Sequence, residues 1–390
     1  VHKDGTCFIQ YTKGAPDEIL SRCTEIWENG SPRPITQKDR EDILAANKKM
    51  ADEALRVLAA AYRKHSSMPA DTSPEALEQN LVFIGLTGMI DPIRPEVKAA
   101  IEECRAAGIR PIMITGDHRD TAVAIAKQLG ILSGDQLAIT GAQLNELSDE
   151  EFEKTIGNYS VYARVQPEHK VRIVNAWRKN GKITAMTGDG VNDAPSIKKA
   201  DIGVGRGITG TDVTKNVADM VLADDNFATI VSAVEEGRRI YDNIRKSIQF
   251  LLSSNLSEVL AIFCSSLLGF TILKPVHLLW INLITDTFPA LALGMERGEK
   301  DIMQRKPRDA KEGIFAHGLG INVIYQGALV ALLTITAYFV GHYMESGVWE
   351  IANSNDGMTM AFLTMSMAEI FHAFNLRSQT KSIFTILHQN

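Results

Sequence analysis

The sequence is short of cysteine and of basic charge, and each shortage excludes a class of protein. None of its four cysteines (Cys7, Cys23, Cys104 and Cys264) forms a C-x-x-C pair, which argues against a zinc knuckle and against a disulfide framework. Its 390 residues include 41 Lys and Arg against 47 Asp and Glu, a net charge of −6, so a protein that coats nucleic acid is not expected. An apolar content of 45% excludes a disordered chain.

A secretory signal is also missing. The chain begins at Val1, with no initiator methionine, basic segment or apolar leader, and we expect it to be a piece of a longer protein. Most charged residues precede Lys246, and long apolar runs follow it. The sequence therefore predicts a soluble part followed by a membrane part, with reduced cysteines facing a cytosol.

Residues 1–90 contain two predicted strands and a predicted helix. The segment FIQYTKGAPDEIL begins as a strand at Phe8, a helix is expected from Glu41 to Tyr62, and LVFIGLTGMI predicts a buried strand over 81–90. This segment is short for an independent domain.

Residues 91–237 alternate apolar strands with amphipathic helices. Strands are expected over 109–115, 159–165 and 182–187, and helices over 120–130 and 167–181. This alternation is typical of a parallel, doubly wound α/β sheet, which binds ligands at the carboxyl ends of its strands.

Four stretches lose nearly all charge after Lys246, namely 248–273, 276–295, 317–344 and 357–376. Each is long enough to cross a hydrocarbon layer of ~30 Å, which needs about 20 helical residues. Arginine and lysine gather before the first stretch and between the second and third, so the positive-inside rule places the soluble part, that loop and the tail in the cytoplasm. We expect a multi-pass integral membrane region in contact with the lipid bilayer; buried helices of a soluble bundle are the less favoured alternative.

The most informative motif is TGDGVNDAPSIKKADIGVGRG at 187–207, where Asp189 and Asp193 follow an apolar strand. Carboxylates beside free backbone N–H groups suit Mg²⁺ held between a carboxylate and phosphoryl oxygens. The tripeptide Thr-Gly-Asp at 115–117 ends an earlier strand, and Lys170 opens a helix. A single GDG turn fits an ordinary surface turn equally well, but three such groups at strand ends indicate phosphoryl chemistry.

These motifs resemble the core of the haloacid-dehalogenase-like phosphotransferases and, more closely, the P-type cation-transporting ATPases, over essentially the whole chain. The resemblance implies a partial α+β nucleotide-binding domain at 1–90, an α/β haloacid-dehalogenase-like (Rossmann-like) phosphorylation domain at 91–237, and an α-helical transmembrane region at 238–390. It also implies ATP and Mg²⁺ as cofactors.

The resemblance further implies roles for residues of the soluble part. Lys13 in KGAP is similar to a lysine of the adenine pocket, and Arg56 in RVLAAAYR to the arginine that reaches the ATP phosphates. Taken alone, Lys13 fits a solvated turn better, and only the ordered set of motifs favours a binding role. Asp91 and Arg94 in DPIRPE resemble the hinge between the two cytoplasmic domains. The residues implied around the transferred phosphoryl group and its Mg²⁺ are Thr115, Gly116, Asp117, Arg164, Lys170, Asp189 (the metal ligand), Asn192 and Asp193.

The nucleophile of that family is missing. P-type ATPases form an aspartyl phosphate on an Asp-Lys-Thr-Gly motif, and no such string occurs between Val1 and Asn390. Asp117 lies in a TGD context that matches a different loop, so we do not expect it to replace the nucleophile. The resemblance implies that the nucleophile, the actuator domain and further membrane helices belong to a missing portion of the same protein, chiefly N-terminal to this chain.

Ionisable residues inside the predicted membrane helices are energetically costly, so they mark functional candidates. Two groups of candidates each share one helix face, namely Asn255 with Glu258 (i, i+3) and Asn282 with Thr285 and Asp286 (i, i+3 and i+4). Glu369 in the fourth predicted helix supplies a third carboxylate. Such oxygen ligands, without thiolates or paired histidines, suit a hard cation.

Single members of this set have simpler explanations. Asn255 or Thr285 alone fits helix packing better, whereas packing does not explain the charges of Glu258 and Asp286. Pro289 follows the second group and can free backbone carbonyls beside it. His372 is expected at the membrane interface rather than as a ligand.

The NLITD string that contains Asn282 is similar to the sixth helix of calcium pumps of the sarco/endoplasmic-reticulum, secretory-pathway and bacterial types. Sodium/potassium pumps carry an aspartate at that position. The resemblance implies one calcium site from Asn255, Glu258, Thr285, Asp286 and Glu369, with Asn282 and Asp286 as half of a second. It thus implies ATP-driven calcium transport through an aspartyl phosphate. The alternatives are a P-type pump for sodium or another cation, and a noncatalytic membrane protein with a decayed phosphatase-like domain.

Overall fold

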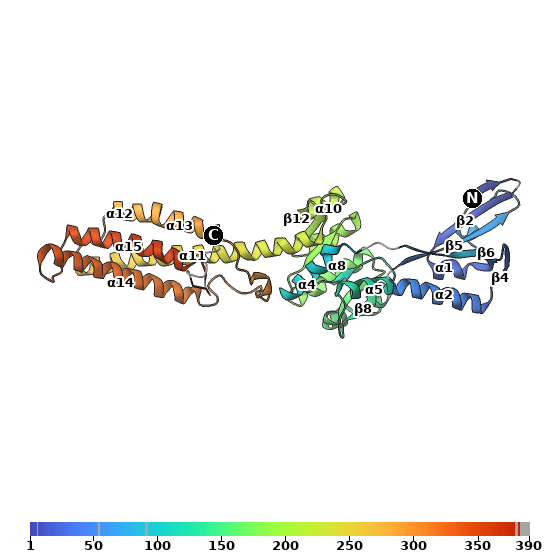
Figure 1. The fold of residues 1–390 in the computed structure, drawn as a ribbon, viewed down its shortest axis with the longest axis horizontal. Coiled ribbons are helices and arrows are strands. Elements are labelled where there is room, and N and C mark those ends of the chain that lie inside the picture. The colour runs from blue at the N-terminus through green and yellow to red at the C-terminus, as the bar shows by residue number, and fades with distance from the viewer. Residues whose placement is uncertain (6, 54, 90–92, 379–380, 383–390) are drawn as a thin grey trace. The chain divides into compact units, whose positions relative to one another are not determined.

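The computed structural model describes residues 1–390 except 6, 54, 90–92, 379–380 and 383–390. It divides into two compact units (Figure 1). The first comprises Val1–Arg105 and Ile109–Thr229, and the second Ala106–Gly108 and Ile230–Asn390. The soluble regions expected at 1–90 and 91–237 thus lie largely in the first unit.

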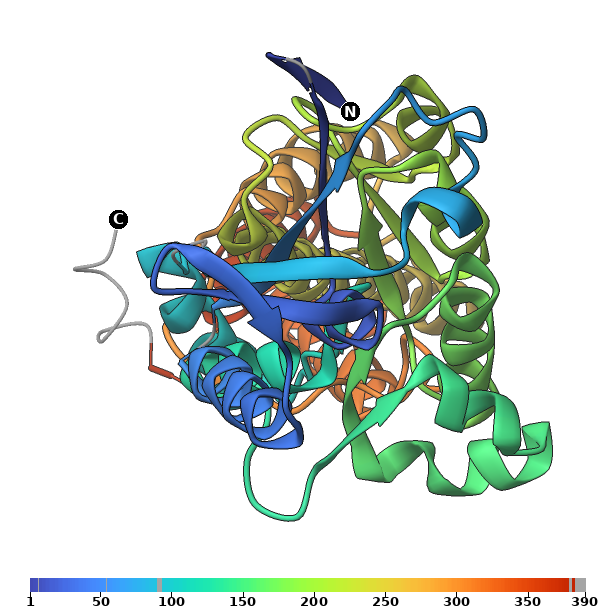
Figure 2. The same cartoon turned by 90° about the vertical axis from the view of Figure 1, so that its right-hand side faces the viewer.

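A six-stranded, mostly antiparallel sheet forms the first part of unit 1. Its order is β1 (His2–Asp4), β2 (Cys7–Gly14), β5 (Arg56–His65), β6 (Leu81–Met89), β3 (Cys23–Glu28) and β4 (Ser31–Pro34), with only β3 and β6 paired in parallel. Helices α1 (Pro16–Ser21) and α2 (Gln37–Asp52) pack on one face, and α3 (Pro74–Leu77) precedes β6 (Figure 2). The core on that face includes Ile19, Leu20, Ala59, Ala61, Leu81 and Phe83.

The helix expected from Glu41 to Tyr62 is wrong beyond Asp52, because Arg56–His65 forms the strand β5. This strand pairs with β2 on one side and β6 on the other, so it is central in the sheet. Small buried side chains at Ala59 and Ala61 let α1 and α2 approach it closely. Tertiary packing therefore overrides the helix preference of its alanines.

Two three-stranded parallel sheets form the second part of unit 1. One has the order β7 (Met113–Ile114), β9 (Tyr159–Ala163), β8 (Leu137–Thr140). The other has the order β10 (Ala185–Gly188), β11 (Ile202–Arg206), β12 (Met220–Leu222). The parallel pairing confirms the expected strand direction, but the residues that the structure describes form two short sheets rather than one doubly wound sheet.

Helices connect and cover these strands. They are α4 (Pro95–Ala106), α5 (Arg119–Leu129), α6 (Gly141–Glu146), α7 (Asp149–Thr155), α8 (Pro167–Lys179), α9 (Ala194–Lys199) and α10 (Asp212–Val217), with 3₁₀ turns at Ile156–Asn158 and Val191–Asp193. The central strand β9 is buried on both faces: Val161 packs in a cluster with residues of α5, and Tyr162 packs with Phe152 and Ile173. Ser160, Val161, Tyr162 and Ala163 are accordingly all buried, without the alternation of a strand that has one exposed face.

Helices make up unit 2. They are α11 (Phe227–Leu268), α12 (Pro275–Trp280), a π-helical segment (Ile281–Asp286), α13 (Thr287–Gly294), a 3₁₀ turn (Ile302–Gln304), α14 (Leu319–Ser346) and α15 (Asn355–Asn375). Among the described residues, the segments Phe227–Leu268, Pro275–Gly294 and Leu319–Ser346 are long and apolar enough to cross a membrane. The fourth expected span forms the 21-residue helix α15, but its polar side chains keep it out of that group.

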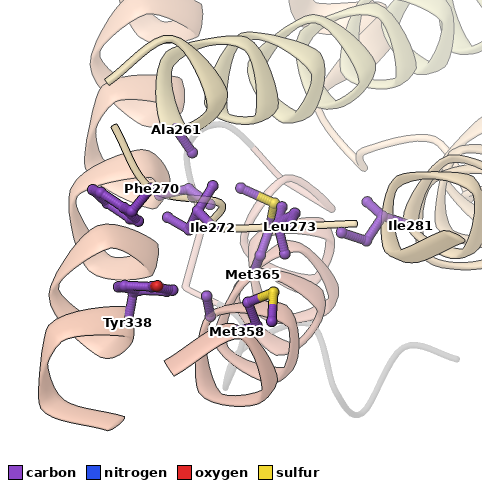
Figure 3. Packing of buried hydrophobic residues seen from close by; sticks show 10 residues of the cluster. Ala261, Phe270, Ile272, Leu273, Ile281, Tyr338, Met358 and Met365 are labelled. Carbon is purple, nitrogen blue, oxygen red and sulfur yellow. The ribbon is translucent and has the colours of Figure 1, made fainter. Parts of the chain in front are cut away.

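The core of unit 2 is built partly by the link that follows α11. Phe270, Ile272 and Leu273 of this link insert between the helices (Figure 3). They pack with Ala261, Ile281, Tyr338, Met358 and Met365. Helices α14 and α15 also approach closely, since a Cβ on Gly341 would lie 2.9 Å from the Asp356 carbonyl oxygen, and one on Gly357 would lie 2.8 Å from that of Tyr338. Small residues allow such close helix contacts in membranes.

Candidate functional sites

The loop after β10 is organised by the buried carboxylate of Asp193. One of its oxygens accepts hydrogen bonds from the backbone N–H groups of Asp189 (3.2 Å) and Gly190 (3.3 Å). The other lies 2.5 Å from the ammonium nitrogen of Lys170, at the start of α8. A Cβ on Gly188 would lie 2.5 Å from the Asp193 Cβ, so glycine is needed for this turn. The structure thus brings Lys170 and Asp193 together, as the site hypothesis requires.

Asp189, by contrast, is half exposed and has a partner that the sequence analysis missed. Its carboxylate lies 3.1 Å from the guanidinium of Arg206, the last residue of β11. Because β10 and β11 are parallel neighbours, their carboxyl ends meet, and this register was the signal that could have identified Arg206. Asn192 is exposed on the same loop.

The Thr115 loop is held to β9. The backbone N–H of Thr115 donates to the Tyr162 carbonyl (2.9 Å), and the Thr115 hydroxyl donates to the Asp117 carboxylate (2.8 Å). Arg164 has a left-handed backbone (φ 49°) that lets its N–H donate to the Asp117 carbonyl (3.1 Å), while its side chain stays exposed. Gly116 is exposed, and a Cβ there would meet nothing within 4 Å, so its backbone is open to a ligand.

An apolar cluster links the Thr115 loop with the loop after β10. Ile114, directly before Thr115, packs against a cluster of Val174, Met186 and Ile197, and Met186 lies in β10. The carboxyl ends of β7 and β10 therefore lie near one apolar core.

The expected nucleotide-binding residues are partly brought together. Lys13 pairs in register with Ala60 of β5, and Arg56 lies four residues earlier on that strand. Since side chains alternate along a strand, Lys13 and Arg56 share the face opposite the Ala59 and Ala61 core. Both are exposed.

The hinge motif is only partly described. Asp91 lies outside the described residues. Arg94 is exposed, and its guanidinium lies 3.5 Å from the Asp225 carbonyl.

Three helices of unit 2 meet at a buried cluster of carboxyl groups. Asp286 is 2% exposed and Glu369 is 1% exposed. The hydroxyl of Ser254 in α11 lies 2.6 Å from one oxygen of each. The Thr285 hydroxyl lies 2.9 Å from the Ile281 carbonyl and 3.2 Å from the second oxygen of Glu369. The second oxygen of Asp286 is buried and has no hydrogen-bond partner among the described residues. Thr285, Asp286 and Glu369 thus come together as expected.

A second carboxylate group lies beside this cluster. The Asn282 amide donates to both oxygens of Glu258, each at 3.0 Å. Asn255 does not join them: it is exposed, and its amide donates to the Leu251 carbonyl of its own helix (2.7 Å). Within the described ranges, no three His, Cys, Asp or Glu side chains form a metal-holding group. Any cation here would need the amide and hydroxyl oxygens as well.

The backbone around these ligands is irregular. Residues Ile281–Asp286 form a π-helix, a rare conformation that occurs mostly as short bulges in α-helices and is frequent at functional sites. Pro289 follows in α13 and, like any proline, has no N–H to donate to the preceding turn. His372 lies 3.2 Å from the Ser253 hydroxyl and contacts Phe250 rather than the carboxyl cluster.

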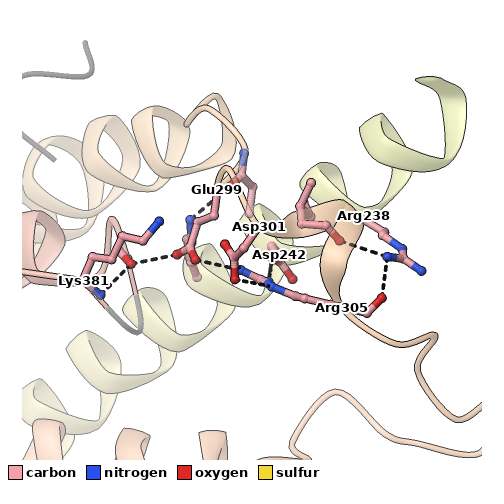
Figure 4. Close-up of polar contacts among 10 residues, drawn as sticks. Arg238, Asp242, Glu299, Asp301, Arg305 and Lys381 are labelled. Atoms are coloured by element: carbon pink, nitrogen blue, oxygen red, sulfur yellow. Dashed lines mark hydrogen bonds and ion pairs between the residues drawn. The ribbon is translucent and has the colours of Figure 1, made fainter. Parts of the chain in front are cut away.

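A polar network joins α11, the loop after α13 and the tail after α15 (Figure 4). Arg305 forms ion pairs with Asp242 (2.7 Å), Glu299 (2.7 Å) and Asp301 (3.3 Å). Hydrogen bonding to Arg305 holds the pKa of Asp301 below its usual value. Arg377, after α15, forms a two-point ion pair with Glu296 (2.9 and 3.1 Å). The sequence analysis did not anticipate this network.

Comparisons with known proteins agree with these features. Residues 1–96 match the sequence model of the P-type ATPase cytoplasmic domain N, and residues 270–390 match that of the cation transporting ATPase C-terminus. The chain belongs to the P-type cation-transporting ATPases.

Curated relatives extend the similarity along the chain. It is 50% identical to calcium-transporting ATPase 1 of Bacillus cereus over 99% of its own length and 44% of that protein. The corresponding values are 48%, 96% and 41% for a calcium-transporting ATPase of Bacillus subtilis, and 43%, 96% and 42% for calcium-transporting ATPase 1 of Lactococcus lactis. The chain thus spans less than half the length of these curated relatives.

Proposed function

We propose that this chain is part of an ATP-driven, Mg²⁺-dependent pump that transports calcium through an aspartyl-phosphate intermediate. The carboxyl cluster carries this proposal: Glu258, Asp286 and Glu369 are buried in helical segments, and among the described residues their side-chain partners are hydroxyl and amide groups. Buried carboxylates without fixed cations are costly unless a mobile cation pairs with them. The names of the relatives support calcium as that cation.

The calcium ligands in this proposal are Asn255, Glu258, Asn282, Thr285, Asp286 and Glu369. One Asp286 oxygen supports it, because it is buried without a hydrogen-bond partner among the described residues, and a buried carboxylate oxygen needs a partner. Asn255 must rotate away from its own helix to join them. A helix outside this chain would supply the remaining ligands of a second site.

Residues 91–237 form, in this proposal, a haloacid-dehalogenase-like phosphorylation domain without its nucleophile strand. Among the described strands, β7 pairs only with β9 and β10 only with β11. Each sheet therefore has an edge that can accept another strand, and Ile114 links the two regions. A strand ending in the Asp-Lys-Thr-Gly motif, from the missing portion, would supply the aspartate.

The phosphate-binding residues are assigned by their positions. Thr115, Gly116, Asp117, Arg164, Lys170, Asn192 and Asp193 surround the transferred phosphoryl group in this proposal, while Lys13, Arg56, Asp91 and Arg94 serve ATP or the hinge. Asp189, with half-exposed hard oxygens, fits a Mg²⁺ ligand. When bound, that ion neutralises charge on the phosphoryl group. Lys170, fixed by Asp193, places a positive charge beside the same loop.

Vesicles that contain the full-length protein test the proposal. ATP with Mg²⁺ should drive calcium uptake and form an acid-stable, hydroxylamine-sensitive phosphoenzyme only when calcium is present. Sodium or another cation that replaced calcium would indicate a pump for that ion. Absence of any phosphoenzyme would favour the noncatalytic alternative.

A further inference from the structure

Ser254 occupies a central place in the carboxyl cluster, although no sequence motif marks it. It lies in α11, is 2% exposed, and its hydroxyl oxygen is 2.6 Å from Asp286 Oδ1 and 2.6 Å from Glu369 Oε1. A single hydroxyl thereby connects α11, the π-helical segment and α15. Since the hydroxyl carries one hydrogen, it donates to one carboxylate and can accept a hydrogen bond from the other acid when that acid is protonated.

These contacts decide which carboxyl oxygens remain for a cation. Each acid has one oxygen held by Ser254. The second oxygen of Glu369 faces Thr285, and in the part of the chain that the structure describes the second oxygen of Asp286 has no hydrogen-bond partner although it is fully buried. Leaving such an oxygen without a partner costs free energy, so its position points to a ligand.

We propose that Ser254 is a positioning residue of the cation site, which holds the carboxyl groups of Asp286 and Glu369 so that their other oxygens face the transported cation. The proposal rests on the calcium-pump function and adds a residue to it. Two close carboxyl groups repel each other, so without the hydroxyl they would rotate apart. The site would then have to be reassembled when the cation enters. Binding is stronger when ligands are fixed in advance.

Neighbouring serines show that the contact is specific. Ser253 donates to the Phe250 carbonyl and faces His372. Ser257 is also fully buried, but its hydroxyl donates to the Ser254 backbone carbonyl (2.7 Å). Ser257→Ala removes the same group from the same helix without touching a carboxyl group, so it is a matched control for Ser254→Ala.

The experiment measures equilibrium binding of radioactive calcium to the full-length protein without ATP. Ser254→Ala should weaken binding by about tenfold, as loss of one hydrogen bond to a charged group implies. Ser257→Ala should bind as the wild type does. Saturating calcium should restore phosphorylation of Ser254→Ala by ATP, and phosphorylation by inorganic phosphate without calcium should persist. Ser254→Cys, with a weak donor of similar size, should bind with intermediate affinity.

The outcomes separate this proposal from the function on which it rests. Wild-type calcium affinity in Ser254→Ala, with affinity lost in Asp286→Asn, would overturn the role of Ser254 and leave the calcium site intact. Wild-type affinity in both variants would overturn the calcium site itself. If Ser254→Ala lost phosphorylation by inorganic phosphate too, it would be misfolded, and Ser254→Cys would then decide. A thiol variant that reacts with phosphate but binds calcium as the wild type does would refute positioning.

Discussion

Carboxylates have different partners in the loops that follow β7 and β10 and in the carboxyl cluster of unit 2. In the loops, Asp193 is paired with Lys170 and Asp189 with Arg206, so these two acids have a cationic side chain as partner. In the membrane cluster, the described partners of Asp286, Glu369 and Glu258 are hydroxyl and amide groups. The difference teaches what each region lacks. Lys170 and Arg206 place fixed positive charge beside the loop acids, whereas buried acids without such a partner need a cation from outside.

The sharpest test of this comparison is Asp286→Asn in the full-length protein. It removes one charge from the cluster and should abolish calcium-activated phosphorylation by ATP, because the charge of the ligands sets the affinity for such cations. Phosphorylation by inorganic phosphate without calcium should remain, since the cytoplasmic loops are unchanged. The control is Asp301→Asn, which removes a carboxylate outside the cluster. Unchanged calcium affinity in Asp286→Asn would mean that Asp286 is not a ligand.

The reciprocal change is Asp189→Asn. Phosphorylation by ATP should fall by orders of magnitude, because Mg²⁺ supplies much of the charge stabilisation in phosphoryl transfer. Equilibrium calcium binding should be retained, and measuring both in one preparation shows whether the two regions fail separately. Loss of calcium binding with normal phosphorylation would reverse the assignment.

A medium effect on stability is expected at the Arg377–Glu296 ion pair. Like Asp193 and Asp189, Glu296 is paired with a cationic side chain. The side chains are 12% and 11% exposed. Arg377→Gln should therefore lower the free energy of unfolding by about 1–3 kcal/mol, between the values for exposed and buried pairs. Thermal unfolding in detergent measures this, with the exposed Lys300→Gln as control. The double variant Arg377→Gln/Glu296→Gln tests the coupling. If its loss of unfolding free energy equalled the sum of the losses in the two single variants, the two side chains would not be coupled.

The smallest effect concerns Asp225, whose carboxylate accepts hydrogen bonds from the Thr209 hydroxyl and from the backbone N–H groups of Ile208 and Thr209. Desolvation raises its pKa, but hydrogen bonds from the Thr209 hydroxyl and from backbone N–H groups outweigh this and lower the pKa to about 2. A depressed pKa stabilises the fold above the unfolded value of about 4, and this contribution is lost as the pH falls towards 2. Asp225→Asn should flatten the pH dependence of the melting temperature in that window. An unchanged slope would contradict the prediction.

Residues that are costly to bury can be identified from the sequence, whereas residues that act through their neighbours carry no such signal. Glu258, Asp286 and Glu369 stood out because a charge in an apolar helix needs a reason. Ser254 has no such signal, since serine is common in helices that pack closely. Arg206 became visible only when β10 and β11 were found to be paired.

Errors in local structure have a similar cause. The segment at 56–62 is rich in alanine and predicts a helix, but pairing on both sides makes it a strand. The π-helical turn at Ile281–Asp286 depends on how the helix meets its neighbours, which a period of 3.6 residues does not encode.

The contact between Gly341 and Gly357 has a mechanical consequence. Backbone atoms of α14 and α15 are so close there that any side chain would push the helices apart. The close packing fixes the two helices against each other, so that one helix cannot slide along the other unless they first separate. Because Glu369 is carried by α15, a stroke that displaced this carboxyl group would have to move α14 with it. A tilt of α14 and α15 together is therefore an easier motion than a shift of either helix alone.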